Sequence, residues 1–345
     1  MKVGLVGYSG SGKSTVFRWL TGEAPDPAKV QQGQVGMADV PDERLDKMSV
    51  HFKPKKGTKH SAIAFLDTPG LMMDERKDNP RRLGILREAN GLLVVLDGFS
   101  VTNLAEQLTK FREELVFADL DIVSNRVDKL TGQLKRTKPA KEREADQAEM
   151  EIVKKVQAAL EAGHSPRTMA MRPEEEKLIR SFQLLTLKPE MVFVNRGDAA
   201  TPLPADLLKL APHAVGAPVQ LERELEELDE ESRAAFAAEL GISGSSRGQT
   251  IRDIFYGMGR IVFFTVGDDE CRAWAIDKGV PAVEAAGAIH TDLSKGFVRA
   301  NVMSYPDFLA AGYEEKHCKT AGTLRQESKE YTVQDGDIMH ILANR

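Results

Sequence analysis

A glycine-rich turn near the start of the chain has the residue types that bind phosphate. The run Gly7-Tyr-Ser-Gly-Ser-Gly-Lys-Ser14 matches the pattern G-x-x-x-x-G-K-[ST]. The glycines let successive backbone N–H groups point at one centre, and a helix that starts near Lys13 directs the positive end of its dipole there. Lys13 can reach the β- and γ-phosphates of a nucleoside triphosphate, and the Ser14 hydroxyl can bind Mg²⁺. The nucleotide-binding residues predicted in this segment are Gly7, Ser9, Gly10, Ser11, Gly12, Lys13, Ser14 and Thr15.

A second motif, Asp67-Thr-Pro-Gly70, follows the apolar run Ala62–Leu66. A carboxylate at the end of a strand beside a phosphate loop is where P-loop enzymes hold Mg²⁺, directly or through water. We therefore predict that Asp67 and Ser14 form the metal site. The backbone N–H of Gly70 can approach the γ-phosphate without steric hindrance, so Gly70 and Lys13 are the predicted catalytic residues.

A third motif, Asn195-Arg-Gly-Asp198, follows the apolar run Met191–Val194. It is similar to the N-K-x-D tetrad of GTPases, whose carboxylate accepts hydrogen bonds from guanine. We predict that Asn195 and Asp198 bind a purine base, and Asp198 favours GTP over ATP without excluding ATP. The alternative is a polar turn that only closes the strand.

The elements that must position these motifs are short apolar runs separated by helical segments. Runs such as Lys2–Val6 and Gly91–Leu96 are typical of buried strands in a parallel α/β sheet. The segments Asn103–Leu134 and Lys141–Ala162 carry apolar residues at helical spacing and predict an antiparallel helical pair.

Another helical segment, Gln220–Leu240, precedes a Gly/Ser-rich linker at Gly241–Gly248. A small α+β domain is predicted after the linker. Its expected elements are strands at Ile261–Val266, Arg272–Ile276, Val298–Met303 and Ile338–Leu342 and a helix near Ala282–Ile289.

Composition and net charge argue against several classes of protein. The chain has 345 residues, a net charge of −5 and two cysteines, Cys271 and Cys318, so no disulfide framework is expected. No run reaches the roughly 18 apolar residues of a membrane span. The phosphate loop begins at Gly7, which leaves no room for a signal peptide, so we expect a cytoplasmic protein without a membrane partner. The acidic balance argues against a DNA-binding protein but leaves a local RNA-binding patch open.

The three motifs and the rest of the chain resemble the YchF/Obg-like ATPases of the translation-factor GTPase class. The resemblance is strongest in the C-terminal residues, which are similar to the family's TGS domain. Outside the C-terminal domain, the similar segments are Pro41–Leu45 and Leu184–Pro189. Within it they are Cys271–Trp274, Ala286–Asp292, Lys295–Phe297 and Val333–Asp337.

This resemblance implies three domains. They are a P-loop G domain at 1–99 and 189–240, a helical, coiled-coil-like insertion at 100–188 and a ubiquitin-like (β-grasp) TGS domain at 260–345. It also implies a Mg²⁺-dependent GTP or ATP hydrolase that acts as a nucleotide switch on the ribosome or on RNA, and we expect a monomer.

Two departures from the family pattern leave an alternative open. Residues Glu23–Val40 contain no Thr or Ser that would complete the Mg²⁺ shell, and Gly10 replaces an Asn that helps to hold a monovalent cation. We therefore expect slow intrinsic hydrolysis without assured potassium stimulation, and the alternative is a nucleotide-binding adaptor with negligible hydrolysis. A P-loop kinase is disfavoured by the insertion and by the C-terminal domain.

Overall fold

The chain forms two compact units. The structure, a computed structural model, describes residues 1–73, 76–197, 202–239 and 245–344. Unit 1 comprises Met1–Gly36 and Ala64–Ser245, and unit 2 comprises Met37–Ile63 and Ser246–Arg345. Residues 37–63, which the sequence analysis assigned to the G domain, thus group with the C-terminal residues. The predicted limits of the three domains remain predictions.

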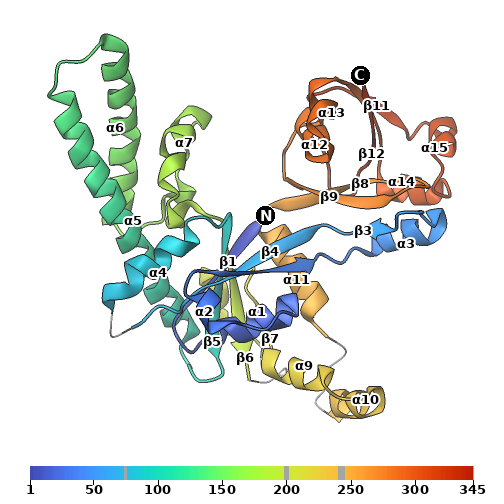
Figure 1. Cartoon of the computed structure of the whole chain (residues 1–345), viewed down its shortest axis with the longest axis horizontal. Coiled ribbons are helices and arrows are strands. Elements are labelled where there is room, and N and C mark those ends of the chain that lie inside the picture. Colours follow the sequence, from blue (N-terminus) through green and yellow to red (C-terminus); the bar gives the residue numbers. More distant parts are fainter. Residues whose placement is uncertain (74–75, 198–201, 240–244, 345) are drawn as a thin grey trace. The chain divides into compact units, whose positions relative to one another are not determined.

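A six-stranded sheet is the centre of unit 1 (Figure 1). β1 pairs in parallel with β4 and β5, and β6 pairs in parallel with β5 and β7. All residues of β5 except the last are buried, which explains its continuous apolar sequence. The predicted parallel α/β fold is confirmed. The strand order is β2 (Gln34–Asp39), β4 (Ala62–Asp67), β1 (Lys2–Val6), β5 (Gly91–Gly98), β6 (Glu190–Arg196) and β7 (Val215–Ala217).

The helices of unit 1 connect these strands or extend from them. The helix predicted at 220–240 is two shorter helices, α9 and α10, because the helix stops near Asp229, whose side chain accepts hydrogen bonds from the backbone and hydroxyl groups of Ser232. The helices are α1 (Lys13–Thr21), α2 (Pro27–Val30), α4 (Asn79–Leu86), α5 (Leu104–Leu134), α6 (Ala140–Glu161), α7 (Pro173–Ile179), α8 (Ala205–Leu210), α9 (Val219–Glu226) and α10 (Glu230–Glu239).

The two longest helices, α5 and α6, form the predicted helical pair, which projects from the sheet of unit 1 (Figure 1). The Asn103 side chain accepts a hydrogen bond from the backbone N–H of Glu106 and so caps the start of α5. Buried apolar residues join the two helices and α7 in one cluster. They include Val116, Val123, Leu130, Ile152, Val156, Leu160 and Ile179.

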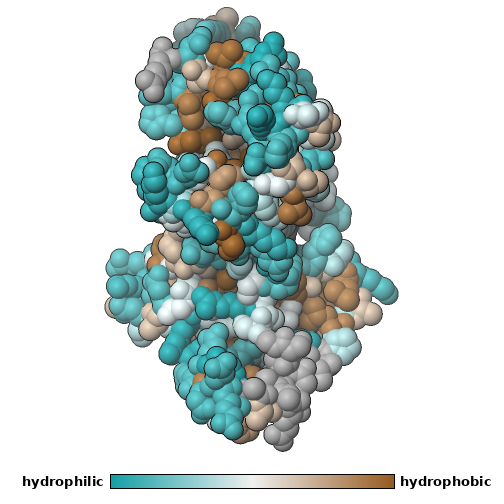
Figure 2. Space-filling model, turned by 90° about the vertical axis from the view of Figure 1, so that its right-hand side faces the viewer, coloured by the Kyte–Doolittle hydropathy of each residue, from teal (hydrophilic) through white to brown (hydrophobic). Residues whose placement is uncertain are grey.

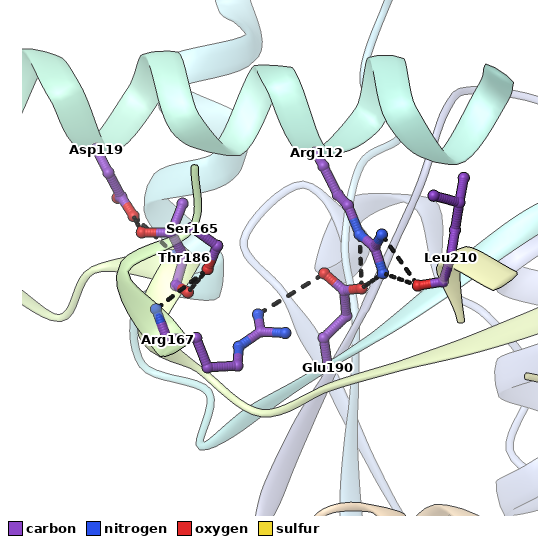
Figure 3. A network of polar contacts seen from close by, with 7 residues as sticks. All are labelled: Arg112, Asp119, Ser165, Arg167, Thr186, Glu190 and Leu210. Carbon is purple, nitrogen blue, oxygen red and sulfur yellow. Dashed lines mark hydrogen bonds and ion pairs between the residues drawn. The ribbon is translucent and has the colours of Figure 1, made fainter. Parts of the chain in front are cut away.

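Two buried carboxylates anchor α5 to the rest of unit 1 (Figure 3). Glu190, the first residue of β6, accepts hydrogen bonds from the Arg112 guanidinium at 2.6 and 3.0 Å and lies 3.7 Å from Arg167. One oxygen of Asp119 accepts hydrogen bonds from the backbone N–H and the hydroxyl of Thr186, both at 2.7 Å. Its other oxygen lies 2.7 Å from Arg87. These contacts tie the helical pair to β6, the strand that ends at the predicted nucleotide-base motif.

Unit 2 contains a second six-stranded sheet. Its mixed strand directions and the packing of α12 on one face agree with the predicted β-grasp fold. Two-residue β3 pairs in parallel with β9, so residues that precede Asp67 in the chain complete one edge of this sheet. The strand order is β11 (Arg325–Glu327), β10 (Phe297–Met303), β12 (Ile338–Ala343), β8 (Arg260–Thr265), β9 (Cys271–Asp277) and β3 (Thr58–Lys59).

The predicted linker at 241–248 is shorter than expected, because α11 already begins at Arg247. Its residues 241–244 lie outside the described part of the chain. The helices of unit 2 are α3 (Glu43–Phe52), α11 (Arg247–Gly257), α12 (Ala282–Ile289), α13 (Thr291–Lys295), α14 (Tyr305–Ala310) and α15 (Glu315–Ala321).

On the face shown in Figure 2, most residues are hydrophilic, and hydrophobic residues lie in groups between them. Within the described residues, none of the helices has the length and apolar character needed to cross a bilayer.

The anchor of the helical pair can be tested at Asp119, whose side chain is fully buried. Replacement by Ala removes the ion pair with Arg87 and both hydrogen bonds from Thr186, and we expect the free energy of unfolding to fall by about 3 kcal/mol. Asp121→Ala, on an exposed position of the same helix, is the control and should change it by less than about 0.5 kcal/mol. Equal stability of the two variants in urea titrations would contradict the anchoring role.

Candidate functional site

The glycine-rich turn connects β1 to α1 at the carboxyl end of the sheet. Gly12 immediately precedes α1 with a φ of 82°, a left-handed conformation that favours glycine. A Cβ atom on Gly7 would come within 2.4 Å of the Val95 carbonyl oxygen, so no other residue fits between β1 and β5 there. The predicted phosphate loop therefore has the required backbone, followed by a helix of nine residues.

The remaining predicted loop residues surround this turn. Ser9 and Gly10 are exposed, whereas Ser14 and Thr15 are half-buried in the first turn of α1. The Ser11 side chain is buried, and its hydroxyl has no hydrogen-bond partner among the described residues. Hydroxyl and backbone groups thus line the loop at the position predicted for phosphate.

Lys13 is almost fully buried at the start of α1, with 6% of its surface exposed. Its ammonium group donates a hydrogen bond of 2.9 Å to the Tyr8 carbonyl oxygen. Burial lowers the pKa of Lys13 to about 8; the Asp67 carboxylate opposes this shift and the nearby Arg82 guanidinium adds to it. An anion bound beside Lys13 would favour its charged form.

Asp67 ends β4 next to Leu5 of β1, and its side chain is fully buried. Neither carboxylate oxygen has a hydrogen-bond partner of ordinary geometry within the described residues. Burial raises the pKa of Asp67, while the nearby Ser14 hydroxyl, Lys13 and the Thr68 N–H favour its charged form. A buried carboxylate with free oxygens beside a hydroxyl fits Mg²⁺, which prefers oxygen ligands and keeps several waters.

The residues after Asp67 lie directly on the phosphate loop. The Ser9 N–H donates to the Leu71 carbonyl oxygen at 2.8 Å, and the Leu71 N–H donates to that of Gly7 at 3.0 Å. A Cβ atom on Gly70 would lie 2.6 Å from Ser9 Cα and 2.7 Å from Lys13 Nζ. Only glycine can bring the backbone this close to the ammonium group, which agrees with the predicted place of Gly70.

Asn195, near the end of β6, also contacts the loop. Its side-chain amide donates a hydrogen bond of 3.2 Å to the Ser11 carbonyl oxygen, and a Cβ atom on Gly12 would lie 2.1 Å from that amide nitrogen. Asp198 lies outside the described residues. The structure thus brings Asn195, Lys13, Asp67 and Gly70 to one end of the sheet, while the role of each remains a prediction.

Sequence reasoning missed Phe99, which follows β5. This residue is 52% exposed, and an atom of its ring lies 3.8 Å from the place of a Cβ atom on Gly12. Its Cβ lies 3.5 Å from the corresponding place on Gly197. An exposed aromatic ring between the phosphate loop and the base motif can stack on a base. A lone Phe at the end of a strand carries no pattern that would have identified it.

The pKa of Lys13 gives a testable pH dependence. A bound triphosphate stabilises the charged ammonium, so the pKa of Lys13 is higher in the complex than in the free protein, where it is about 8. Above pH 8 binding must take up a proton, and we expect affinity for a non-hydrolysable triphosphate to fall by up to about tenfold per pH unit. The measurement is titration from pH 7 to 9.5, with Lys13→Arg, whose charge does not titrate there, as the control. Constant affinity of the parent over this range would contradict the assignment.

Comparison with known protein families agrees with the predicted P-loop GTPase fold. A family model described as "50S ribosome-binding GTPase" matches residues 2–126. The model of the YchF-GTPase C-terminal region, described as "Protein of unknown function", matches residues 261–344. These two segments hold the phosphate loop and most of the second sheet.

Relatives extend the similarity over the full length. The "Ribosome-binding ATPase YchF" of Bacillus subtilis (strain 168) is 32% identical over 371 residues, which cover 100% of this chain and 99% of the relative. The protein of the same name from Escherichia coli O157:H7 is 32% identical over 368 residues, with 99% of each chain covered. A solved structure, that of the Schizosaccharomyces pombe YchF GTPase, covers 99% of this chain with a TM-score of 0.76 and 26% identity. Motifs, fold and full-length similarity agree: the chain belongs to the YchF family.

Proposed function

We propose that this chain is a Mg²⁺-dependent purine nucleoside triphosphatase whose nucleotide state controls its binding to the ribosome. The observation that carries the proposal is the buried Lys13 and Asp67 pair, with the free oxygens of Asp67 beside the phosphate loop. Burying a cation and a carboxylate carries a desolvation cost, which ligands of opposite charge bound beside each group would reduce.

Each residue has a role in this proposal. The N–H groups of residues 7–14 and the Lys13 ammonium bind the phosphate oxygens, and Gly70 presents its N–H to the γ-phosphate. Ser14 and Asp67 would hold Mg²⁺, which would neutralise negative charge on the phosphates. None of the motif side chains is an obvious general base, so catalysis rests on charge stabilisation and positioning, and turnover without a partner is slow.

The base site is proposed to favour GTP. Asn195 is fixed on the loop by its hydrogen bond to Ser11, Phe99 offers a stacking face, and Asp198 supplies a carboxylate of the length used for guanine. The bacterial relatives are named ATPases and the solved relative is named a GTPase. Both nucleotides therefore belong in any binding test.

The ribosome is the proposed partner because the bacterial relatives are named ribosome-binding and one matched family is described as 50S ribosome-binding. The net charge of −5 means that contact with ribosomal RNA depends on local basic residues. A cytoplasmic monomer without membrane or DNA partners is part of the same proposal.

The second candidate is a nucleotide-binding adaptor with negligible hydrolysis. The absence of Thr and Ser from residues 23–40 favours it, because a hydroxyl in that segment would complete the Mg²⁺ shell. Single-turnover release of phosphate, with and without ribosomes, separates the candidates. Nucleotide binding without phosphate release, both with and without ribosomes, supports the adaptor.

The switch can be tested by sedimentation of ribosomes with the full-length protein. A cut at 241–248 is unsuitable, because it would separate residues 246–345 from residues 37–63 of the same unit. We expect apparent affinity to differ by about fivefold or more between a non-hydrolysable triphosphate and the diphosphate, and to weaken as salt rises.

The control is Lys13→Ala, which removes the charge that binds the phosphates. It should sediment equally with either nucleotide while remaining folded. Equal sedimentation of the parent in both nucleotide states would contradict a switch.

A further inference from the structure

We propose that Arg82 is an additional catalytic residue, which supplies from within the chain a positive charge to the γ-phosphate during hydrolysis. This inference rests on the proposed function. It adds a side chain from α4 that none of the three motifs contains, and it makes hydrolysis depend on the segment after Gly70.

Arg82 lies on α4, is half-buried and donates a hydrogen bond from its guanidinium to the Gly70 carbonyl oxygen. Gly70 is also close to Lys13, because a Cβ atom on Gly70 would lie 2.7 Å from the ammonium nitrogen. Two cationic side chains thus lie close to the glycine that is expected at the γ-phosphate.

The Arg82 guanidinium and the Lys13 ammonium both reach Gly70, so two positive charges lie close together there. Like charges at such a distance repel each other, and a triphosphate bound between them removes this penalty. A guanidinium has five N–H groups, so one can stay on Gly70 while others contact phosphate oxygens.

Hydrogen bonds also hold α4 in place. The buried Asn79 side chain makes two hydrogen bonds of 3.0 Å with Met72, one with its N–H and one with its carbonyl oxygen. These bonds fix the first turn of α4 to the segment that follows Gly70. Arg82 is three residues further on, so the same contacts hold its helix against the phosphate site.

The reaction itself needs this charge. A water oxygen bonds to the γ-phosphorus, and the bond from this phosphorus to the oxygen that bridges it to the β-phosphate breaks. The electron pair of that bond stays on the diphosphate, and one proton is released with inorganic phosphate. Negative charge that develops on the bridging and γ-phosphate oxygens is stabilised by Lys13 on one side and Arg82 on the other.

The test replaces Arg82 with Met, which keeps the apolar stem but removes the charge. We expect single-turnover hydrolysis of GTP and ATP to fall by about 100-fold, with diphosphate affinity and thermal stability unchanged. Arg82→Lys should lose less, because it keeps a charge without the planar fork. Arg81→Met, on an exposed neighbouring position of α4, is the matched control and should hydrolyse like the parent.

A second measurement separates this proposal from the proposed function. If the parent binds triphosphate but does not hydrolyse it, the hydrolase function fails, and trapping of the diphosphate with aluminium fluoride then decides the role of Arg82. Trapping by the parent and its loss in Arg82→Met supports the role. The role is overturned if parent and Arg82→Met hydrolyse or trap equally, or if a non-hydrolysing parent does not trap. It is also overturned if Arg82→Met loses diphosphate affinity as much as it loses rate.

Discussion

The buried Lys13 and Asp67 pair is the constraint on which the rest of the site depends. Burial displaces both pKa values toward the neutral forms: that of Lys13 falls to about 8 and that of Asp67 rises. The free protein thus carries a desolvation cost at the junction of β1, β4 and α1. In the proposed function, phosphate beside the ammonium and Mg²⁺ beside the carboxylate would both relieve this cost.

Backbone contacts connect this pair to other parts of unit 1. The backbone of Leu71 forms hydrogen bonds with both Gly7 and Ser9. A phosphate oxygen that accepted the Ser9 N–H would therefore compete with the Leu71 carbonyl oxygen for it. Asn195 joins the loop to β6, and Glu190 at the other end of that strand is held by Arg112 of the long helix α5. Hydrogen bonds therefore connect the phosphate loop, β6 and α5.

The predicted residues that the structure brings to one end of the sheet have local chemical patterns. Gly7–Ser14 follow β1, Asp67 and Asn195 lie at the ends of β4 and β6, and parallel strands bring their ends to one edge. Phe99 and Arg82 were missed, because an exposed ring after a strand and an arginine on a short helix have no distinctive spacing. The place of residues 37–63 in unit 2 was missed too, because it depends on long-range pairing of β3 with β9.

The most direct test of the account is the effect of Mg²⁺ on nucleotide binding by the parent and by Asp67→Asn. Fluorescent GTP and ATP analogues are titrated into each protein with Mg²⁺ and with chelator. The account predicts that removing Mg²⁺ weakens triphosphate binding by the parent by about tenfold or more, and that Asp67→Asn loses most of this dependence. The same Mg²⁺ dependence in both proteins would contradict it, because Asp67 would then not hold the metal.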